Sequence, residues 1–559
     1  MSTRLVRLVL LPLLFIGLAG CCRARPMDVM EPAGDAGNVP PVVVMAQVKD
    51  GNGEYLSEKR GDRSYNIYQA LPEGDPRVAG VRRMLDAHPA LVRELKLLEA
   101  VKRHWKGLPM PNGADAAAWK KALADPFYFS IDGSLEERGW IGFVLRDGEA
   151  TEEHLSTSFV ELNLTLDELS EGWAATGLAH EMGHAVFYVA LAQWVVPAWD
   201  HLSEIARAPA AFHDVQRATQ PLMAMNEGVA EHLDTMVELS CAVGEDERGR
   251  LAADRSLRTA RGYVSPRPRR TEMILWNRAI FEPMLLPEGT TEHAGPDEAY
   301  RTYMNAQPVD NHRLRSCGEM LSTEGVVAAL LTRLILDPKL QKAAVSADLL
   351  SEFAPPAADG SPEAWLADLG PEGRVYLRLF RAMAATPAPA ALPELGDLGF
   401  REIAQAWMRE FPADAPHVGR VIVQSTLAAT ASATLADQLR TLLATPAIVP
   451  PVDPKKEEVK ASGAALETLS VSAMDGQKLF AACGPPLWIS VPERKICGDF
   501  SDECIPFEMD LNAAGFMEIM MYPGMDATRA REILTRRDRR GFFENKEEFL
   551  EMAGKATER

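Results

Sequence analysis

The chain has 559 residues, of which 47% are hydrophobic and 25% are charged. This length exceeds what one hydrophobic core usually supports, so we expect roughly two to four folded units. The formal net charge of −20 argues against a broad nucleic-acid-binding surface, although it leaves room for a local basic module.

Residues 1–20 have the pattern of a signal peptide. A basic segment, MSTRLVR, precedes the apolar run LVLLPLLFIGLAG, which is too short and too broken by proline to span a bilayer. The run ends in LAGC, which resembles the lipobox of bacterial lipoproteins. The resemblance implies that Cys21 is lipidated and becomes the mature N-terminus. A plain secretory signal is the alternative.

Residues 21–45 are predicted to form a flexible tether, because they are polar and rich in proline and glycine. Cys22, not an aspartate, follows the lipidated position. By analogy with bacterial lipoproteins, this implies the outer membrane of the cell envelope in preference to the inner membrane. No later segment is apolar for long enough to span a membrane, so we expect the lipid to be the only anchor.

Export to an oxidising compartment predicts disulfide bonds. The easiest pairing is among Cys483, Cys497 and Cys504, although sequence alone does not fix it. These cysteines lack paired CxxC spacing, so a structural zinc site is the weaker interpretation.

Residues 46–385 are predicted to be mainly α-helical with a small β-sheet. The spacing of apolar residues over 75–105 favours helix. The segments 127–131 and 140–145 resemble short strands, and FVELNLTL at 159–166 alternates apolar and polar residues, as a half-buried strand does.

The next predicted helix runs from an N-cap at Ser170 to Val196, just before a proline, and carries the sequence HEMGH. Positions i and i+4 lie on one helix face, so His180 and His184 can hold one metal ion between them. Glu181 lies beside that ion, where its carboxylate can take a proton from a bound water. This is the HExxH pattern of zinc hydrolases. A pair of satisfied core histidines is the alternative.

A catalytic zinc needs a third protein ligand. The helix predicted from Pro221 to a closing Gly244 carries NEGVAE, which resembles the ligand motif of gluzincin metallopeptidases. The resemblance implies that Glu227 is the third ligand and that Glu231 orients a ligand histidine. A helix-dipole role and a surface role are their respective alternatives. Glu324, in STEGVVA, is a weaker rival for third ligand.

The gluzincin resemblance covers the two ligand helices and implies an α+β zincin-like domain that hydrolyses peptide bonds of a peptide or protein substrate. Zinc would activate water, with Glu181 as general base. The chain departs from the family in the long segment between the two motifs and in Ser322, which stands where aminopeptidase N-type enzymes have a catalytic tyrosine. Tyr300, Tyr303 and His312 are candidates for donors to the tetrahedral oxyanion.

Proline-rich segments divide the remainder of the chain. We predict a helical extension, a linker stiffened by proline and solvated by charge, a small Cys-containing segment and an all-α terminal module, at residues 396–444, 445–466, 467–508 and 509–556.

The terminal module resembles the helix-hairpin-helix repeat of competence-type DNA receptors. Pro523 and Gly524 match the hairpin in which backbone N–H groups approach a phosphate. Positive charge comes from Arg529, Arg531, Arg536, Arg537, Arg539 and Arg540. However, Asp526 replaces the second hairpin glycine, and its carboxylate would repel a phosphate or fill the anion site itself. We therefore predict a structural or protein-docking role in preference to binding of nucleic acid.

The alternative function for the whole chain is a lipoprotein adaptor. In that case the zincin-like domain would be non-catalytic, and the terminal module would bind DNA or a partner in the envelope. Metal content and chelator-sensitive peptide hydrolysis distinguish the two functions.

Overall fold

The computed structural model describes residues 40–60, 63–131, 138–148, 150–170, 172–198, 215–242, 270–283, 312–356, 361–388, 392–443, 457–472, 476–496 and 505–554. The predicted signal peptide, Cys21, Cys22 and most of the tether lie outside these ranges. No helix within them combines the length and apolar character needed to cross a membrane.

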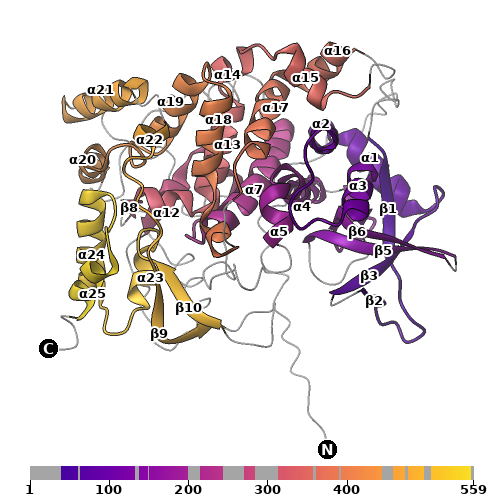
Figure 1. Ribbon diagram of the computed structural model, residues 1–559, viewed down its shortest axis with the longest axis horizontal. Coiled ribbons are helices and arrows are strands. Elements are labelled where there is room, and N and C mark those ends of the chain that lie inside the picture. The colour runs from indigo at the N-terminus through magenta and orange to yellow at the C-terminus, as the bar shows by residue number, and fades with distance from the viewer. Residues whose placement is uncertain are drawn as a thin grey trace, which may run out of the picture.

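A six-stranded sheet lies on one side of the molecule, and helices make up most of the rest (Figure 1). Its strand order is β1-β4-β6-β5-β3-β2, and β1 also pairs with β3. The strands are β1 (Val42–Gln47), β2 (Ser57–Arg60), β3 (Arg63–Ala70), β4 (Phe127–Ser130), β5 (Arg138–Asp147) and β6 (Ala150–Glu161). The prediction of a mainly α chain with a small sheet is confirmed.

Strand β6 differs from the half-buried strand predicted at 159–166. It ends at Glu161, and the side chains of residues 159–162 are all buried. Glu161 accepts a hydrogen bond from the hydroxyl of Tyr68 at 3.1 Å. Helices cover one face of β6 and an aromatic cluster containing Phe159 covers the other. Both faces are therefore buried, and the alternation does not mark a solvent-exposed face.

The segment predicted to be helical over 75–105 forms two helices, α1 (Pro76–Ala87) and α2 (Pro89–Lys106). Pro89 cannot donate a backbone hydrogen bond but is well suited to a first helical position, so the chain starts a new helix there.

The two motif-bearing helices are α4 (Gly172–Ala190) and α7 (Pro221–Ala242). Helix α4 ends earlier than predicted, and α5 (Ala192–Ala198) follows with its proline inside the helix. Helix α4 begins two residues after Ser170, whose hydroxyl donates to the carbonyl of Asp167. Helix α7 begins at the predicted proline, and Gly244 lies outside the described residues.

Helix α13 (Glu324–Ile335) packs against α7 on the side away from the sheet. Glycines allow these three helices to approach closely. A Cβ on Gly183 of α4 would overlap the Cα of Ala230 on α7, and one on Gly228 of α7 would lie 2.6 Å from Val327 Cγ1 on α13. Gly183 lies within HEMGH and Gly228 within NEGVAE, so the two sequence motifs also set the helix spacing.

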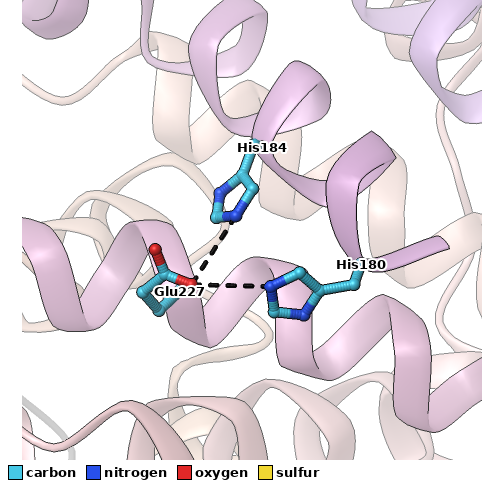
Figure 2. A group of neighbouring side chains, drawn as sticks. All are labelled: His180, His184 and Glu227. Carbon is cyan, nitrogen blue, oxygen red and sulfur yellow. Dashed lines mark ion pairs between the residues drawn. The ribbon is translucent and has the colours of Figure 1, made fainter. Parts of the chain in front are cut away.

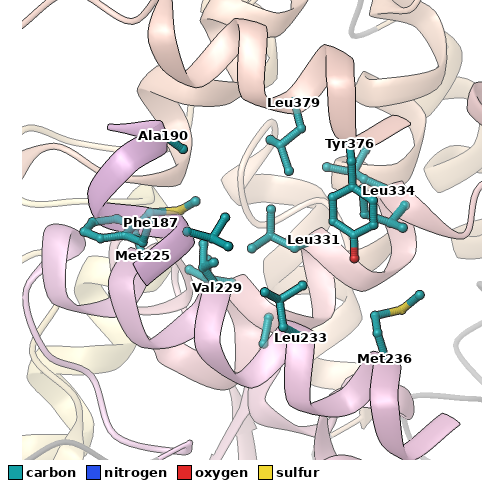
Figure 3. Packing of buried hydrophobic residues seen from close by; sticks show 14 of the residues in the cluster. Phe187, Ala190, Met225, Val229, Leu233, Met236, Leu331, Leu334, Tyr376 and Leu379 are labelled. Carbon is teal, nitrogen blue, oxygen red and sulfur yellow. The ribbon is translucent and has the colours of Figure 1, made fainter. Parts of the chain in front are cut away.

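One continuous core joins the sheet to nearly all of the helices. Figure 3 shows Val229 and Leu233 of α7 packed against Leu331 of α13 and against Leu379 of α17 (Gly370–Ala384). Further helices in this region are α3 (Ala116–Ala124), α10 (Arg270–Leu275), α12 (Cys317–Leu321), α14 (Pro338–Lys342), α15 (Ala347–Phe353), α16 (Pro362–Asp368), α17 (Gly370–Ala384), α18 (Phe400–Glu410), α19 (Ala415–Ser425) and α20 (Ala433–Leu443).

The predicted boundary between 385 and 396 does not separate two cores. Helix α18 packs on α17, and α19 packs on α13, because the apolar faces of α18 and α19 are buried in the same cluster. The predicted linker is also shorter than expected. Helix α21 (Glu457–Ser472) occupies its second half and packs on α19 and α20, with Leu466 buried.

The C-terminal unit has a core of its own. Strands β9 (Trp488–Ile496) and β10 (Ile505–Asp510) pair antiparallel, and α23 (Phe516–Met520), α24 (Ala527–Arg540) and α25 (Lys546–Gly554) pack with them. The predicted Cys-containing segment and helical module are therefore one unit, because residues of both share this core. We call β9 to α25 the C-terminal unit.

The disulfide bond joins Cys317, at the start of α12, to Cys483, just after the short helix α22 (Gly476–Leu479). The predicted pairing among the three C-terminal cysteines is thus wrong for Cys483. The other two, Cys497 and Cys504, lie outside the described residues.

Candidate metal centre

Helices α4 and α7 bring His180, His184 and Glu227 together (Figure 2). The Nε2 atom of each histidine lies 3.6 Å from Oε2 of Glu227. His180 and His184 lie one turn apart on α4, and Glu227 approaches them from the first half of α7. The three side chains are largely buried, with 14%, 9% and 6% of their surfaces exposed.

The second nitrogen of each ring also faces a polar side chain of α7. Nδ1 of His184 donates to Oδ1 of Asn226 at 3.0 Å, which leaves the Nε2 lone pair facing Glu227. Nδ1 of His180 lies 3.6 Å from Oε1 of Glu231. Glu231 therefore lies where the sequence predicted it, beside a candidate ligand histidine. Sequence reasoning did not assign a role to Asn226, although it is the first residue of the NEG motif.

This donor set fits a zinc ion. Zinc binds imidazole nitrogen and carboxylate oxygen at about 2.0–2.1 Å in tetrahedral geometry, which places ligand atoms roughly 3.4 Å apart. The two separations of 3.6 Å are close to that value. The third position comes from Glu227 and not from its rival: Glu324 belongs to neither of the metal-capable groups found among the described residues.

Glu181 lies beside the three candidate ligands. Its Oε2 is 4.0 Å from Nε2 of His184, and the residue is 8% exposed. A carboxylate in this place can exchange a proton with a water bound at the metal position. Tyr188, one turn beyond His184, stacks with it at a centroid separation of 6.5 Å. Burial, together with the charges of Glu227 and Glu181, raises the pKa of Tyr188, so its hydroxyl stays protonated.

The predicted oxyanion donors are not placed at this centre. Tyr300 and Tyr303 lie outside the described residues. His312 opens strand β8 (His312–Leu314), which pairs with β7 (Phe281–Pro283), and the structure describes only its backbone.

A buried hydrogen-bonded histidine fixes α7 from its other side. His232 bonds through Nδ1 to Thr332 of α13 and through Nε2 to the Tyr376 hydroxyl of α17, both at 2.8 Å. Burial, assisted by the charge of Arg93, lowers the pKa of His232 to about 3, so this imidazole is neutral at pH 7. These bonds connect three helices behind the candidate ligands.

A carboxylate lies at the start of the helix that follows the hairpin of the C-terminal unit. Gly524 has a φ of 75°, a backbone conformation that favours glycine, so this residue allows the chain to turn. Asp526 caps α24 by accepting from the backbone N–H of Arg529 at 2.8 Å. The carboxylate thus occupies the helix N-terminus that a phosphate would use.

One of the predicted phosphate-attracting arginines is buried. Arg537 is fully buried, pairs with Glu319 at 2.7 Å and donates to the carbonyls of Leu511 and Ala514. The prediction that Arg537 contributes to a basic surface is therefore wrong. Its guanidinium satisfies backbone and carboxylate acceptors inside the fold.

No protein-family model matches this chain, and comparisons with curated proteins and with solved structures also found no match.

Proposed function

We propose that the protein is a zinc-dependent peptidase of gluzincin type, with an α+β zincin-like domain built from the sheet and helices α4 and α7. One observation carries the proposal: both histidine Nε2 atoms and the Glu227 carboxylate converge, with Glu181 alongside them. Neither a satisfied pair of core histidines nor a helix-dipole role for Glu227 requires this convergence.

The residues of this centre would have separate roles in peptide-bond hydrolysis. Bound zinc would lower the pKa of a coordinated water to about 7 and polarise a peptide carbonyl. Glu181 would accept the water proton and return it to the leaving amine. Asn226 and Glu231 would hold the two imidazoles so that their Nε2 atoms keep facing the ion.

We also propose that the protein is anchored in the bacterial cell envelope by a lipid on Cys21, with the outer membrane favoured. The support is the LAGC sequence after a basic and apolar leader. Cys21→Ser should release the protein from washed membranes. Tight membrane association of this variant would contradict the proposal.

For the C-terminal unit we propose a structural role within the chain in preference to DNA binding. Arg537 is buried in ion pairs, and Asp526 occupies the anion position of the hairpin. The chain should bind duplex DNA weakly at physiological salt. Tight, salt-resistant binding would contradict this role.

The central experiment compares metal content with hydrolysis. The purified chain should contain one zinc that resides at His180, His184 and Glu227, and a chelator should abolish cleavage of an unstructured protein substrate. Glu181→Gln should keep zinc and lose activity by on the order of 100-fold or more. Glu227→Ala should lose zinc, whereas the control Glu324→Gln should keep it.

Two results would contradict the peptidase proposal. Normal zinc binding by Glu227→Ala would mean that another residue is the third ligand. A folded wild-type chain that binds no zinc and cleaves no peptide would instead favour the adaptor function.

A further inference from the structure

A short helix lies between the disulfide bond and the candidate zinc centre. Helix α12 begins at Cys317, whose sulfur is bonded to Cys483. A helix of five residues is too short to be stable without contacts to the rest of the fold. Next to the disulfide, Gly318 lies so close to the backbone carbonyl of Asn512 in the C-terminal unit that a Cβ would overlap it. The start of α12 is therefore fixed by a covalent bond and by close packing.

The other end of α12 holds the segment that leads into α7. The carbonyl of Ser322, which follows α12, accepts a hydrogen bond from the backbone N–H of Thr219 at 2.6 Å. Thr323 forms an antiparallel β-bridge with Ala218, and all four of these residues are buried. Helix α7 begins shortly after this segment, at Pro221. The end of α12 therefore holds the start of α7 in place.

The residues that α7 contributes to the candidate centre lie close to this attachment. Asn226, which holds the ring of His184, and the candidate ligand Glu227 lie within the first two turns of α7. Gly228 packs against Val327 of α13, which is the next helix after α12. A shift of α12 would therefore displace this part of α7. Zinc tolerates little displacement, since it needs its ligand atoms at about 2.0–2.1 Å.

We propose that formation of the disulfide between Cys317 and Cys483 activates the candidate zinc centre, an inference that rests on the zinc site proposed above. The reduced chain folds but binds zinc weakly. Without the bond, α12 loses its covalent attachment and the start of α7 opens more often. Glu227 then reaches the two histidines for a smaller fraction of the time, which lowers the apparent zinc affinity by that fraction.

The redox step is a thiol–disulfide exchange with an oxidised dithiol protein. Cys483 is half-buried whereas Cys317 is 1% exposed, so the thiolate of Cys483 attacks the disulfide of the partner first and forms a mixed disulfide. The thiolate of Cys317 then attacks the sulfur of Cys483 and releases the partner as a dithiol. The chain loses two protons and two electrons, and the partner gains them. If the chain is exported as proposed, its centre gains zinc only after it leaves the reducing interior of the cell.

The test is the zinc affinity of the full chain with and without this bond. Competition with a chromophoric chelator measures it, at a temperature where circular dichroism shows that every variant is folded. Cys317→Ser/Cys483→Ser should bind zinc more weakly than the oxidised wild type by about tenfold or more, as when a residue that orients a ligand is lost. A phosphine reductant is used because thiols themselves bind zinc. It should weaken zinc binding by the wild type to the same extent and have no further effect on the double variant.

Phe353→Ala is the control for a general loss of stability. Phe353 is fully buried in α15, which packs on α2, α16 and α17. The cavity left by this substitution should lower the melting temperature about as much as loss of the disulfide does, while the zinc affinity stays that of the wild type. Hydrogen–deuterium exchange is the second measurement. The backbone amides at the start of α7 should exchange faster in the double variant than in Phe353→Ala.

The outcomes separate this inference from the peptidase proposal. Equal zinc affinity in the oxidised wild type and the double variant would overturn the inference and leave the peptidase proposal standing. An equal loss of affinity in Phe353→Ala would also overturn it, because the effect would then come from general stability. Unchanged amide exchange at the start of α7 in the double variant would exclude the connection through α12 and overturn it as well. A wild type that binds no zinc in either redox state would overturn the peptidase proposal and this inference together.

Discussion

The candidate zinc ligands depend on side chains that never touch the ion. Asn226 accepts from Nδ1 of His184, and this bond both selects the tautomer and stops the ring from rotating. Without it, the Nε2 lone pair would face Glu227 for only part of the time. We therefore expect residues beyond the three candidate ligands to contribute to the zinc affinity of the centre.

Asn226→Ala should weaken zinc binding by about 10–100-fold, because residues that orient ligand histidines typically contribute that much. Competition with a chromophoric chelator measures the change. Asn163→Ala, the same substitution at an exposed position, is the control and should leave zinc affinity unchanged. Equal affinities in the two variants would contradict a positioning role for Asn226.

At the scale of elements, the distance between α4 and α7 decides whether Glu227 can reach the histidines. Gly183 of α4 lies against the backbone of Ala230 of α7, so the helices are in contact at a point within the HEMGH motif. The glycine is needed here for close approach, since a helical backbone does not otherwise require it.

Gly183→Ala should destabilise the fold by about 1–3 kcal/mol, because the added methyl overpacks this contact, and it should also weaken zinc binding as α7 is pushed away. Gly177→Ala is a matched control on the same helix: nothing lies within 4 Å of its added Cβ. That substitution should stabilise the protein by about 0.5–1 kcal/mol. Chemical denaturation and zinc titration of both variants check the pair.

Sequence reasoning succeeded where the relevant contacts are local. The spacing of His180 and His184 on one helix face, and the motif around Glu227, predicted three side chains that the structure does bring together. It failed where distant residues decide the environment. In the sequence, Glu161 has the position of a solvent-exposed residue on a half-buried strand. In the structure it is buried and accepts a hydrogen bond from Tyr68, 93 positions away. Arg537 looks like part of a basic surface, but its partner Glu319 lies far upstream in the chain.

At the scale of the whole molecule, the disulfide between Cys317 and Cys483 closes a loop of 166 residues. A long loop loses much conformational entropy when it is closed in the unfolded chain, so the bond should stabilise the fold by on the order of 4–5 kcal/mol. The double variant Cys317→Ser/Cys483→Ser should melt at a lower temperature than the wild type. A reductant should lower the melting temperature of the wild type much more than that of the variant. Equal effects of the reductant would assign the stabilisation to another cysteine.

The C-terminal unit is attached to the rest of the chain by a buried network of charges. Arg313 of strand β8 pairs with Glu282 at 2.7 Å, with Asp538 of α24 at 2.9 Å and with Glu319 of α12. Glu282 also accepts from the backbone N–H of Phe516 at 2.7 Å. Because the carboxylates are buried and Arg313 is only 11% exposed, losing one partner would leave a charge without compensation.

Two carboxyl groups of this network respond to pH in opposite directions. Burial, opposed by Arg313 and assisted by the charge of Glu319, raises the pKa of Glu282 from 4.5 to about 7. Burial alone would raise the pKa of Glu319, but the charges of Arg313 and Arg537 together outweigh it and lower this pKa from 4.5 to about 2. Glu319 therefore contributes stability that is lost as the pH falls below about 4.5. Glu282 contributes stability that is lost as the pH rises from about 4.5 to about 7.

Glu282→Gln should consequently flatten the dependence of stability on pH. The folded wild type holds the Glu282 proton more tightly than the unfolded chain does, so its free energy of unfolding should fall between about pH 5 and pH 7. Burial raises the pKa of Asp510 to about 6 as well, so the difference between wild type and variant isolates the contribution of Glu282. Denaturation at several pH values measures this difference in the free energy of unfolding.

Glu319→Gln is the contrasting variant. It should lower the free energy of unfolding by about 3–5 kcal/mol at pH 7, because Arg313 and Arg537 lose a shared partner. Parallel pH profiles for the wild type and Glu282→Gln would show that Glu282 does not titrate in this range.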